Sequence, residues 1–192
     1  MLYLLRHGQT AWSESGQHTS RTDIPLTPEG EDRARRAGRL LGQLRSNEAP
    51  PRVLSSPRSR ALRTAELAGL TVDEVTEDLA EWDYGEYEGL TTQQIRETVP
   101  NWTVWTHPCP GGETAAEVGA RATKLLDRFR PIPGDLILVG HGHFSRVLIS
   151  TCLTMPPTAG VHFGLDAAGI AALGDERGVP QIHTLNLPPL TP

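Results

Sequence analysis

The residues of this chain best suited to chemistry are two histidines that each precede a glycine. Arg6-His7-Gly8 and His141-Gly142 each directly follow a short apolar run. Such a run is typical of a buried strand, and open α/β sheets bind their ligands at the carboxyl ends of strands. Neutral imidazole is a nucleophile toward phosphorus, and a guanidinium holds phosphoryl oxygens in a fork. If the two strands are neighbours, both imidazoles reach one pocket, where we expect the glycines to leave room for a ligand.

Two further segments add charges of both signs. Ser56 and Pro57 predict a helix start that places Arg60 in the first turn, where free N–H groups and the helix dipole favour an anion. Glu81 lies in a loop that is rich in aromatic residues. Two guanidiniums, two imidazoles and a carboxylate suit phosphoryl transfer, which needs mainly positioning and positive charge around three equatorial oxygens. That chemistry requires no metal.

In this order, the segments resemble the motifs of the histidine phosphatase superfamily, also called the phosphoglycerate mutase-like family. The resemblance covers residues 2 to about 150 and is carried by Arg6-His7-Gly8, 16–23 (GQHTSRTD), 55–65 (SSPRSRALRTA), Glu81 with Tyr84-Gly85, and His141-Gly142. Within the family, the chain is most similar to the phosphatase branch. The segments that look like those of small acid and sugar-phosphate phosphatases are 85–89 (GEYEG), 111–113 (GGE) and 141–143 (HGH).

The resemblance implies a role for each residue. His7 would be the nucleophile that becomes a transient phosphohistidine, and the cations beside it would lower its pKa and keep it neutral. Arg6 and Arg60 would bind phosphoryl oxygens, and His141 would stabilise the charge of the transferring group. Glu81 would protonate the leaving oxygen and then deprotonate the attacking water. The implied substrate-binding residues are Arg6, Gln17, Thr19, Ser20, Arg60, His141 and Gly142, with no metal site and no cofactor.

Some positions depart from the family pattern or leave two interpretations open. Ser13 stands where many relatives have Asn, and Ser20 stands where Gly is common, so the phosphate contacts at both are in question. Arg58 adds a cation that either widens the positive pocket or is solvated. His143 is expected at the rim of the pocket or at a helix N-terminus, and a metal pair with His141 is the less favoured interpretation.

The other aromatic residues and histidines lack such context. Trp102 and Trp105, together with the segment 109–113, form either a lid over the substrate or ordinary aromatic packing. The remaining histidines are expected to be structural or exposed: His18, His107, His162 and His183.

Strands alternate with helices along the chain, which predicts an α/β three-layer sandwich: a mostly parallel open sheet with helices on both faces. The expected strands are 2–5, 52–55, 136–139, 168–173 and 181–187. Helix starts are expected at Thr27-Pro28, Ser56-Pro57, Thr91, Thr114 and about residue 144. Nothing marks a linker or an internal repeat, so we expect one domain over residues 1–192.

The composition excludes several classes of function. A net charge of −5 over 192 residues argues against a nucleic-acid or anionic-membrane surface. The only lysine is Lys124, so neither a P-loop lysine nor a Schiff-base lysine has a candidate. Two cysteines without metal-type spacing fit a reducing, cytoplasmic setting. No apolar stretch is long enough for a membrane span or a signal peptide.

Three functions are compatible with these residues. The favoured one is a metal-independent phosphomonoesterase, of the acid or sugar-phosphate type, that acts on a small phosphorylated metabolite. The alternative is a cofactor-dependent phosphoglycerate mutase, but the stretch 91–112, where mutases carry lysine and paired arginine, holds only Arg96. A non-catalytic binder of phosphorylated ligands is less favoured because every catalytic position is present. The sequence identifies no natural substrate and leaves a homodimer open.

Overall fold

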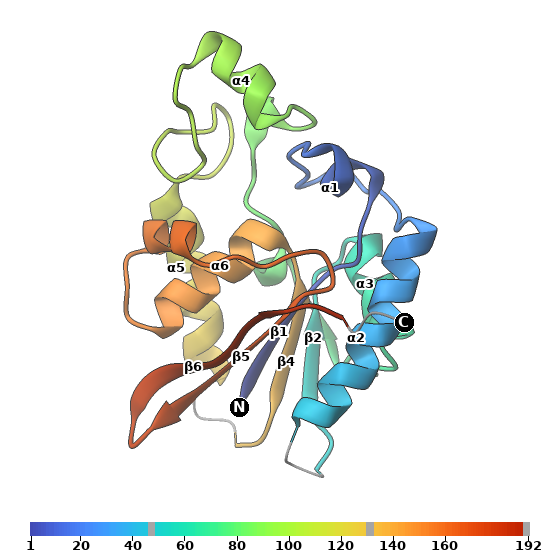
Figure 1. The fold of residues 1–192 in the computed structure, drawn as a ribbon. Helices are drawn as coiled ribbons and strands as arrows, with labels where there is room; N and C mark the ends of the chain where they lie inside the picture. Colours follow the sequence, from blue (N-terminus) through green and yellow to red (C-terminus); the bar gives the residue numbers. More distant parts are fainter. Residues whose placement is uncertain (46–48, 130–132, 190–192) are drawn as a thin grey trace.

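One sheet of six strands organises the chain. The computed structural model describes residues 1–45, 49–129 and 133–189. The strand order is β3-β2-β4-β1-β5-β6. The strands are β1 (Leu2–Arg6), β2 (Arg52–Ser55), β3 (Glu74–Val75), β4 (Leu136–Gly140), β5 (Ile170–Glu176) and β6 (Val179–Leu187) (Figure 1). β1, β4, β2 and β3 run parallel, whereas β5 and β6 are antiparallel to their neighbours, so the mostly parallel sheet is as predicted.

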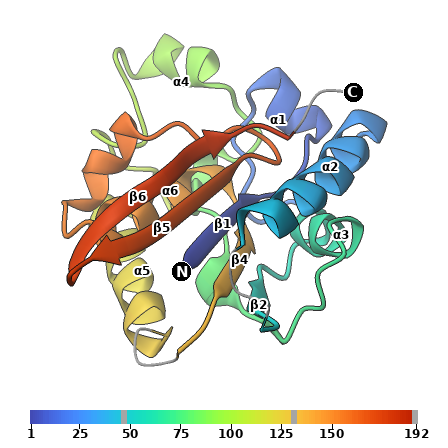
Figure 2. The same ribbon diagram turned by 60° about the horizontal axis from the view of Figure 1, so that its bottom comes forward.

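Helices cover both faces of this sheet. They are α1 (Ala11–Ser15), α2 (Pro28–Leu44), α3 (Ser59–Leu67), α4 (Thr92–Thr98), α5 (Ala115–Phe129) and α6 (Gly142–Cys152), with short 3-10 helices at Glu77–Leu79, Gly85–Tyr87 and Pro157–His162. Successive side chains of β1 point to opposite faces: Tyr3 and Leu5 pack in the core beside α2 and α3, and Leu4 packs in the core beside α5 and α6. Figure 2 shows the two pairs of helices on opposite sides of the strands. The three-layer sandwich is therefore confirmed.

β1 and β4 are direct neighbours, which fixes the position of the site. Arg6 is paired with Gly140 at the end of this parallel ladder. The residues that follow, His7 and His141, therefore leave the sheet at the same edge. Figure 1 shows α1 and α4 at that end of the molecule, above the helices that flank the sheet.

Most helix starts agree with the sequence, and two differ. Thr27 caps α2 by accepting the N–H of Gly30, and the expected caps at Thr91 and Thr114 are present. Helix α3 begins at Ser59 with Arg58 as its N-cap, so the prediction that Ser56-Pro57 starts it is wrong, although Arg60 does lie in the first turn. Helix α6 begins at Gly142 rather than at residue 144, because the extended backbone ends at His141. Within the described ranges, no helix has both the length and the apolar composition needed to cross a bilayer.

Candidate active site

The two predicted imidazoles lie side by side at the carboxyl edge of β1 and β4. The ring centroids of His7 and His141 are 5.2 Å apart, in an edge-on arrangement. Both side chains are buried, with exposed fractions of 5% and 0%. The predicted convergence of the two His-Gly segments is therefore present.

The surroundings of His7 suit a nucleophile. Its Nδ1 lies 2.7 Å from the carbonyl oxygen of Gly8. Because a carbonyl only accepts, Nδ1 carries the proton and the lone pair is on Nε2. Burial, followed by the charges of Arg6 and Arg60, holds the pKa of His7 well below its usual value. The cations act in the expected direction, but burial contributes more than they do.

Three buried polar atoms around His7 have no partner among the described residues: Nε of Arg6, Nε of Arg60 and Nδ1 of His141. Such atoms are rare in folded proteins because leaving them unpaired costs free energy. Each of these side chains is nevertheless held by a hydrogen bond at another of its nitrogens. Nη1 of Arg6 donates to the carbonyl of Leu165 over 2.6 Å.

Arg60 holds the loop that follows α1. Its Nη1 donates to the carbonyl of Thr22, and its Nη2 donates to the carbonyls of Thr19 and Ser20, over 2.9–3.2 Å. The side chain is fully buried. The cation is therefore fixed beneath the loop and beside His7, as part of the floor of the site.

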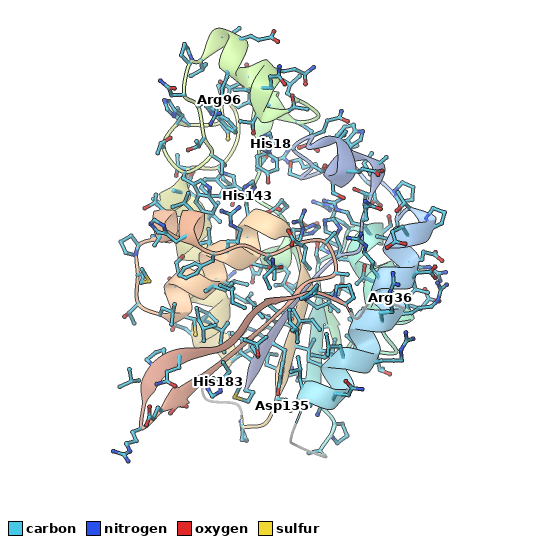
Figure 3. The ribbon with its side chains drawn as sticks, viewed as in Figure 1. His18, Arg36, Arg96, Asp135, His143 and His183 are labelled. Atoms are coloured by element: carbon cyan, nitrogen blue, oxygen red, sulfur yellow. The ribbon has the colours of Figure 1, made fainter. Side chains whose placement is uncertain are left out.

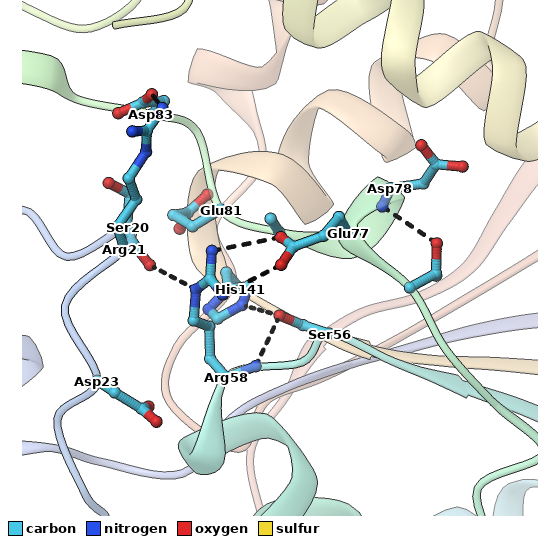
Figure 4. A network of polar contacts seen from close by, with 12 residues as sticks. Ser20, Arg21, Asp23, Ser56, Arg58, Glu77, Asp78, Glu81, Asp83 and His141 are labelled. Carbon is cyan, nitrogen blue, oxygen red and sulfur yellow. Dashed lines mark hydrogen bonds and ion pairs between the residues drawn. The ribbon is translucent and has the colours of Figure 1, made fainter.

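The hydroxyl of Ser56 orients His141 (Figure 4). Oγ of Ser56 lies 2.7 Å from Nε2 of His141 and accepts the N–H of Arg58. The hydroxyl proton has no other acceptor among the described residues, so Ser56 donates to Nε2 and the imidazole proton is on Nδ1. Burial, then His7 and the nearby arginines, hold the pKa of His141 well below its usual value. His141 is thus a neutral imidazole with an unpaired N–H donor.

Glu81 is held against the N-terminus of α6. Its Oε1 accepts the N–H groups of Trp82 and Phe144 over 2.9 and 2.7 Å, and its Oε2 accepts the N–H of His143 over 3.0 Å. The side chain is buried, with 7% exposed. Oε1 is saturated, whereas Oε2 retains a lone pair for a proton. The carboxylate therefore presents one reactive oxygen in a fixed place.

An ion pair that the sequence did not indicate clamps the loop of Glu81. Arg121 of α5 binds both carboxylate oxygens of Glu113 over 2.8 and 3.0 Å. It also donates to the carbonyls of Ala80 and Glu81. Glu113 in turn accepts the backbone N–H of Asp83. The guanidinium of Arg121 thereby holds the backbone before Glu81 directly and the backbone after it through Glu113.

A cavity of about 180 Å³ opens above His7, and we call it the first cavity. Of the residues predicted for catalysis and binding, those that line it are Arg6, His7, Gln17, Thr19, Glu81 and Gly142. Arg60 and His141 are fully buried and are not among its lining residues. Ser20, also predicted to bind substrate, does not line this cavity, and its N–H and its hydroxyl both bind Glu88.

Aromatic residues and histidines form the far wall of the first cavity. His18 and His143 both line it, with ring centroids 6.0 Å apart (Figure 3). Nδ1 of His143 lies 2.6 Å from the hydroxyl of Tyr84. Burial lowers the pKa of His18 to about 4 and holds that of His143 well below its usual value. His143 lies in the first turn of α6, as expected. His18 was expected to be structural or exposed, and it lines the cavity instead.

The tryptophans form packing rather than a lid. Trp102 and Trp105 are 1% and 8% exposed and belong to the core. Trp102 meets the ring of His18 edge-on, and Trp105 meets that of His143 edge-on. Their side chains support the cavity wall from behind, and neither lines the cavity.

Arg58 belongs to a second cavity of about 240 Å³ on the other side of Glu81. Its guanidinium pairs with Glu77 and its Nε donates to the carbonyl of Ser20 (Figure 4). It therefore does not line the first cavity, and its side chain remains 20% exposed beside Glu77. Ser13, by contrast, lines the first cavity.

Gly8 allows close packing of the chain, whereas Gly142 both contacts Arg6 and lines the first cavity. A Cβ atom at Gly8 would lie 2.4 Å from the carbonyl oxygen of Gly30 in α2. A Cβ atom at Gly142 would lie 3.2 Å from the guanidinium carbon of Arg6. The expected role is therefore corrected for Gly8, whereas the position of Gly142 agrees with it.

His141 and His143 do not form part of a metal centre within the described part of the chain. No group of three histidine, cysteine or acidic side chains there has an arrangement that would hold a metal ion. Their ring nitrogens bind Ser56 and Tyr84 instead. Positive charge at the site comes from arginine.

This fold, with two histidines, buried arginines and a carboxylate at one sheet edge, defines a phosphotransfer enzyme of the α/β class. The chain belongs to the histidine phosphatase superfamily (branch 1), whose model matches residues 2–188. An acid phosphatase of Mycobacterium tuberculosis is 50% identical over 188 residues, which are 97% of this chain and 92% of that protein.

Solved structures agree with this assignment. The product of an open reading frame of Mycobacterium tuberculosis has a TM-score of 0.95 and 49% identity, over 98% of each chain. A mycobacterial glucosyl-3-phosphoglycerate phosphatase has a TM-score of 0.83 and 27% identity, over 96% of this chain and 98% of that one. The resemblance noted in the sequence is confirmed, and the chain is a phosphatase.

Proposed function

We propose that this phosphatase is a metal-independent phosphomonoesterase that acts through phosphohistidine on His7. The observation that carries the proposal is that three buried polar atoms around His7, on Arg6, Arg60 and His141, have no hydrogen-bond partner in the described part of the chain. A phosphoryl group supplies acceptor oxygens to such atoms, and two guanidiniums compensate its charge.

In the first step, Nε2 of His7 forms a bond to phosphorus while the ester P–O bond breaks. The carbonyl of Gly8 holds the Nδ1 proton and supports the positive charge that develops on the ring. The electron pair of the broken bond goes to the leaving oxygen, which takes a proton from Oε2 of Glu81. Nδ1–H of His141 donates to a phosphoryl oxygen.

In the second step, water attacks phosphorus and the P–N bond breaks, which returns the electron pair to Nε2 of His7. Glu81, now a carboxylate, accepts the proton of that water. Phosphate leaves, and both side chains regain their starting protonation. Glu81 borders both cavities, so water has a second approach to it that does not pass the substrate.

That second approach favours hydrolysis over the mutase reaction, which must keep water from the phosphoenzyme. Arg96, the cation in the stretch 91–112, is exposed on α4 and donates to the carbonyl of Trp102. It does not line the first cavity. The mutase alternative therefore lacks its substrate contact from this segment.

The substrate class we propose is a small phosphorylated metabolite. A cavity of about 180 Å³ accommodates a phosphoryl group and a short organic chain. Relatives named acid phosphatase and glucosyl-3-phosphoglycerate phosphatase support phosphomonoesters of this kind.

The proposal is tested by trapping the intermediate. Brief incubation with ³²P-labelled phosphomonoester, quenched in base to preserve phosphohistidine, is expected to label the peptide that contains His7. His7→Ala is expected to remove both label and phosphate release, whereas His183→Ala, an exposed histidine on β6, keeps both. Excess EDTA is expected to leave turnover unchanged. Phosphate release by His7→Ala at the wild-type rate would overturn the proposal.

A further inference from the structure

Three arginines stand out among the described residues because they are at least half-buried and form no ion pair. They are Arg6, Arg60 and Arg146; the other arginines without an ion pair, Arg39, Arg96 and Arg177, are exposed. Arg6 and Arg60 flank His7 and are accounted for by the phosphoryl group. Arg146 lines the same first cavity and is not accounted for.

The position of Arg146 is fixed by the protein. It lies on α6, one turn after His143, and its guanidinium stacks on Trp105 at 4.7 Å from the ring centroid. Nε donates to the carbonyl of Gly160 over 3.0 Å, and Nη2 donates to that of Val161 over 3.2 Å. Nη1 has no partner among the described residues. The guanidinium is therefore held in one place, and its Nη1 is available as a hydrogen-bond donor.

Among the described residues, no carboxylate forms an ion pair with Arg146, although the charge of Glu81 acts on its guanidinium through space. Glu81 is the acidic residue that lines the cavity, and its oxygens accept three backbone N–H groups rather than the guanidinium. A partly buried guanidinium that has no ion-pair partner costs free energy, which an anion bound directly to it recovers. His18 and His143, the histidines of the far wall, are neutral hydrogen-bonding groups and do not compete for that anion.

We propose that Arg146 binds a second anionic group of the substrate, a carboxylate or a second phosphate, a few bonds from the ester that His7 attacks. The proposal rests on the proposed function, because it assigns the substrate class of the same cavity. The neutral rings of His18 and His143 supply hydrogen bonds to hydroxyl groups along the chain between the two anions. The natural substrate is then a compact phosphomonoester with charge at both ends.

The test compares pairs of compounds that differ only in the second anion. Glycerol 3-phosphate is paired with 3-phosphoglycerate, and 1,3-propanediol monophosphate with the bisphosphate. Each is measured as a competitive inhibitor of p-nitrophenyl phosphate hydrolysis, so that none needs to be the natural substrate. In the wild type, the compound with the second anionic group is expected to bind about tenfold tighter than its partner in at least one pair. This is the scale of a charge-assisted hydrogen bond.

In Arg146→Met, that ratio is expected to fall to about one, whereas Arg146→Lys keeps part of it. Arg39→Met, which removes an exposed arginine on α2, is the matched control and keeps the full ratio. If the ratio falls only for the pair that contains 3-phosphoglycerate, the second anion that Arg146 binds is a carboxylate. If it falls only for the pair that contains the bisphosphate, the second anion is a phosphate.

An unchanged ratio in Arg146→Met overturns the inference. If Arg146→Met does not fold, as judged by its melting temperature, an unchanged ratio in Arg146→Lys together with Arg146→Gln has the same meaning. The test is independent of the intermediate, since a ratio of inhibition constants stands whether or not phosphohistidine is trapped on His7.

Discussion

The hydroxyl of Ser56 and the imidazole of His141 come from segments 85 positions apart and meet at 2.7 Å in the interior of the molecule. Ser56 leads out of β2, and His141 leads out of β4, its parallel neighbour in the sheet. The contact is therefore a consequence of strand order. It leaves Nδ1 of His141 as a buried donor without a partner among the described residues, and so aims a proton at the place where the phosphoryl group is expected.

Ser56→Ala tests this relationship. Without the hydroxyl, both tautomers of His141 become accessible and Nδ1 no longer always carries the proton. We expect kcat/KM to fall by about tenfold, as for the loss of one hydrogen bond of about 1.4 kcal/mol. Nitrogen NMR of labelled histidine is expected to show the tautomer of His141 change.

Ser55→Ala is the matched control for that variant. Ser55 is also fully buried, and its hydroxyl donates to the carbonyl of Ser56 rather than to a histidine. Equal losses of activity in the two variants, with an unchanged tautomer in each, would mean that Ser56 has only a structural role.

The sequence predicted those parts of the site whose positions depend on where the strands end. The apolar runs before His7 and His141 are buried on both faces, which places both strands in the middle of a parallel sheet. Glu81 was predicted from motif resemblance, and its contact with the N-terminus of α6 explains its position. These features follow from local pattern and from the rule that ligands bind at carboxyl strand edges.

What the sequence did not predict depends on contacts between distant loops. Ser56 followed by proline has the pattern of a helix cap, but its hydroxyl is taken by a histidine from another strand. Ser20 is bound by Glu88, 68 positions away, and no local pattern indicates that pairing. Arg146 did leave a signal, since it lies three residues after His143 and thus on the same side of one helix.

Glu81→Gln is expected to harm alkyl phosphates by about 10² or more in the first chemical step, the lower range for loss of general acid catalysis. The loss for p-nitrophenyl phosphate should be much smaller, because nitrophenolate leaves without a proton. The measurement is the rate of the pre-steady-state burst, which excludes the attack of water.

Asp83→Asn provides the comparison for this variant. Asp83 pairs with Arg21 and accepts the N–H of Gly85, and it lines the second cavity but not the first (Figure 4). In Asp83→Asn, the burst rate is expected to depend on the leaving group as it does in the wild type. A stronger leaving-group dependence in Asp83→Asn than in Glu81→Gln would identify Asp83 as the acid instead.

The pKa of His7 predicts how the free enzyme responds to acid. Burial, Arg6 and Arg60 lower it well below 6.5, so the ring stays neutral and nucleophilic in acid that would protonate an ordinary imidazole. NMR titration of the His7 ring, assigned by its loss in His7→Gln, is expected to show a midpoint clearly below 6.5. A midpoint at or above 6.5 contradicts the environment described for this residue.

His18 predicts how stability depends on pH. Burial lowers its pKa from 6.5 to about 4 in the folded protein, so between these values the unfolded chain binds more protons than the folded one. Stability must therefore fall as the pH is lowered through this window. From pH 7 to pH 5, His18 alone should account for about 2 kcal/mol of the loss, at about 1.4 kcal/mol for each pH unit below 6.5. His7, His141 and His143, whose pKa values are also lowered, act in the same direction.

His18→Gln removes this proton-binding difference while keeping a polar side chain near Thr92, with which the imidazole interacts. Urea unfolding at pH 7 and pH 5 is expected to show a smaller pH-dependent loss in the variant, by about 2 kcal/mol. His162→Gln, at an exposed position, should retain the full wild-type dependence. Because the comparison is a difference between two pH values, any constant cost of either substitution cancels. An equal pH dependence in wild type and His18→Gln would show that His18 is free to take up its proton in the folded protein.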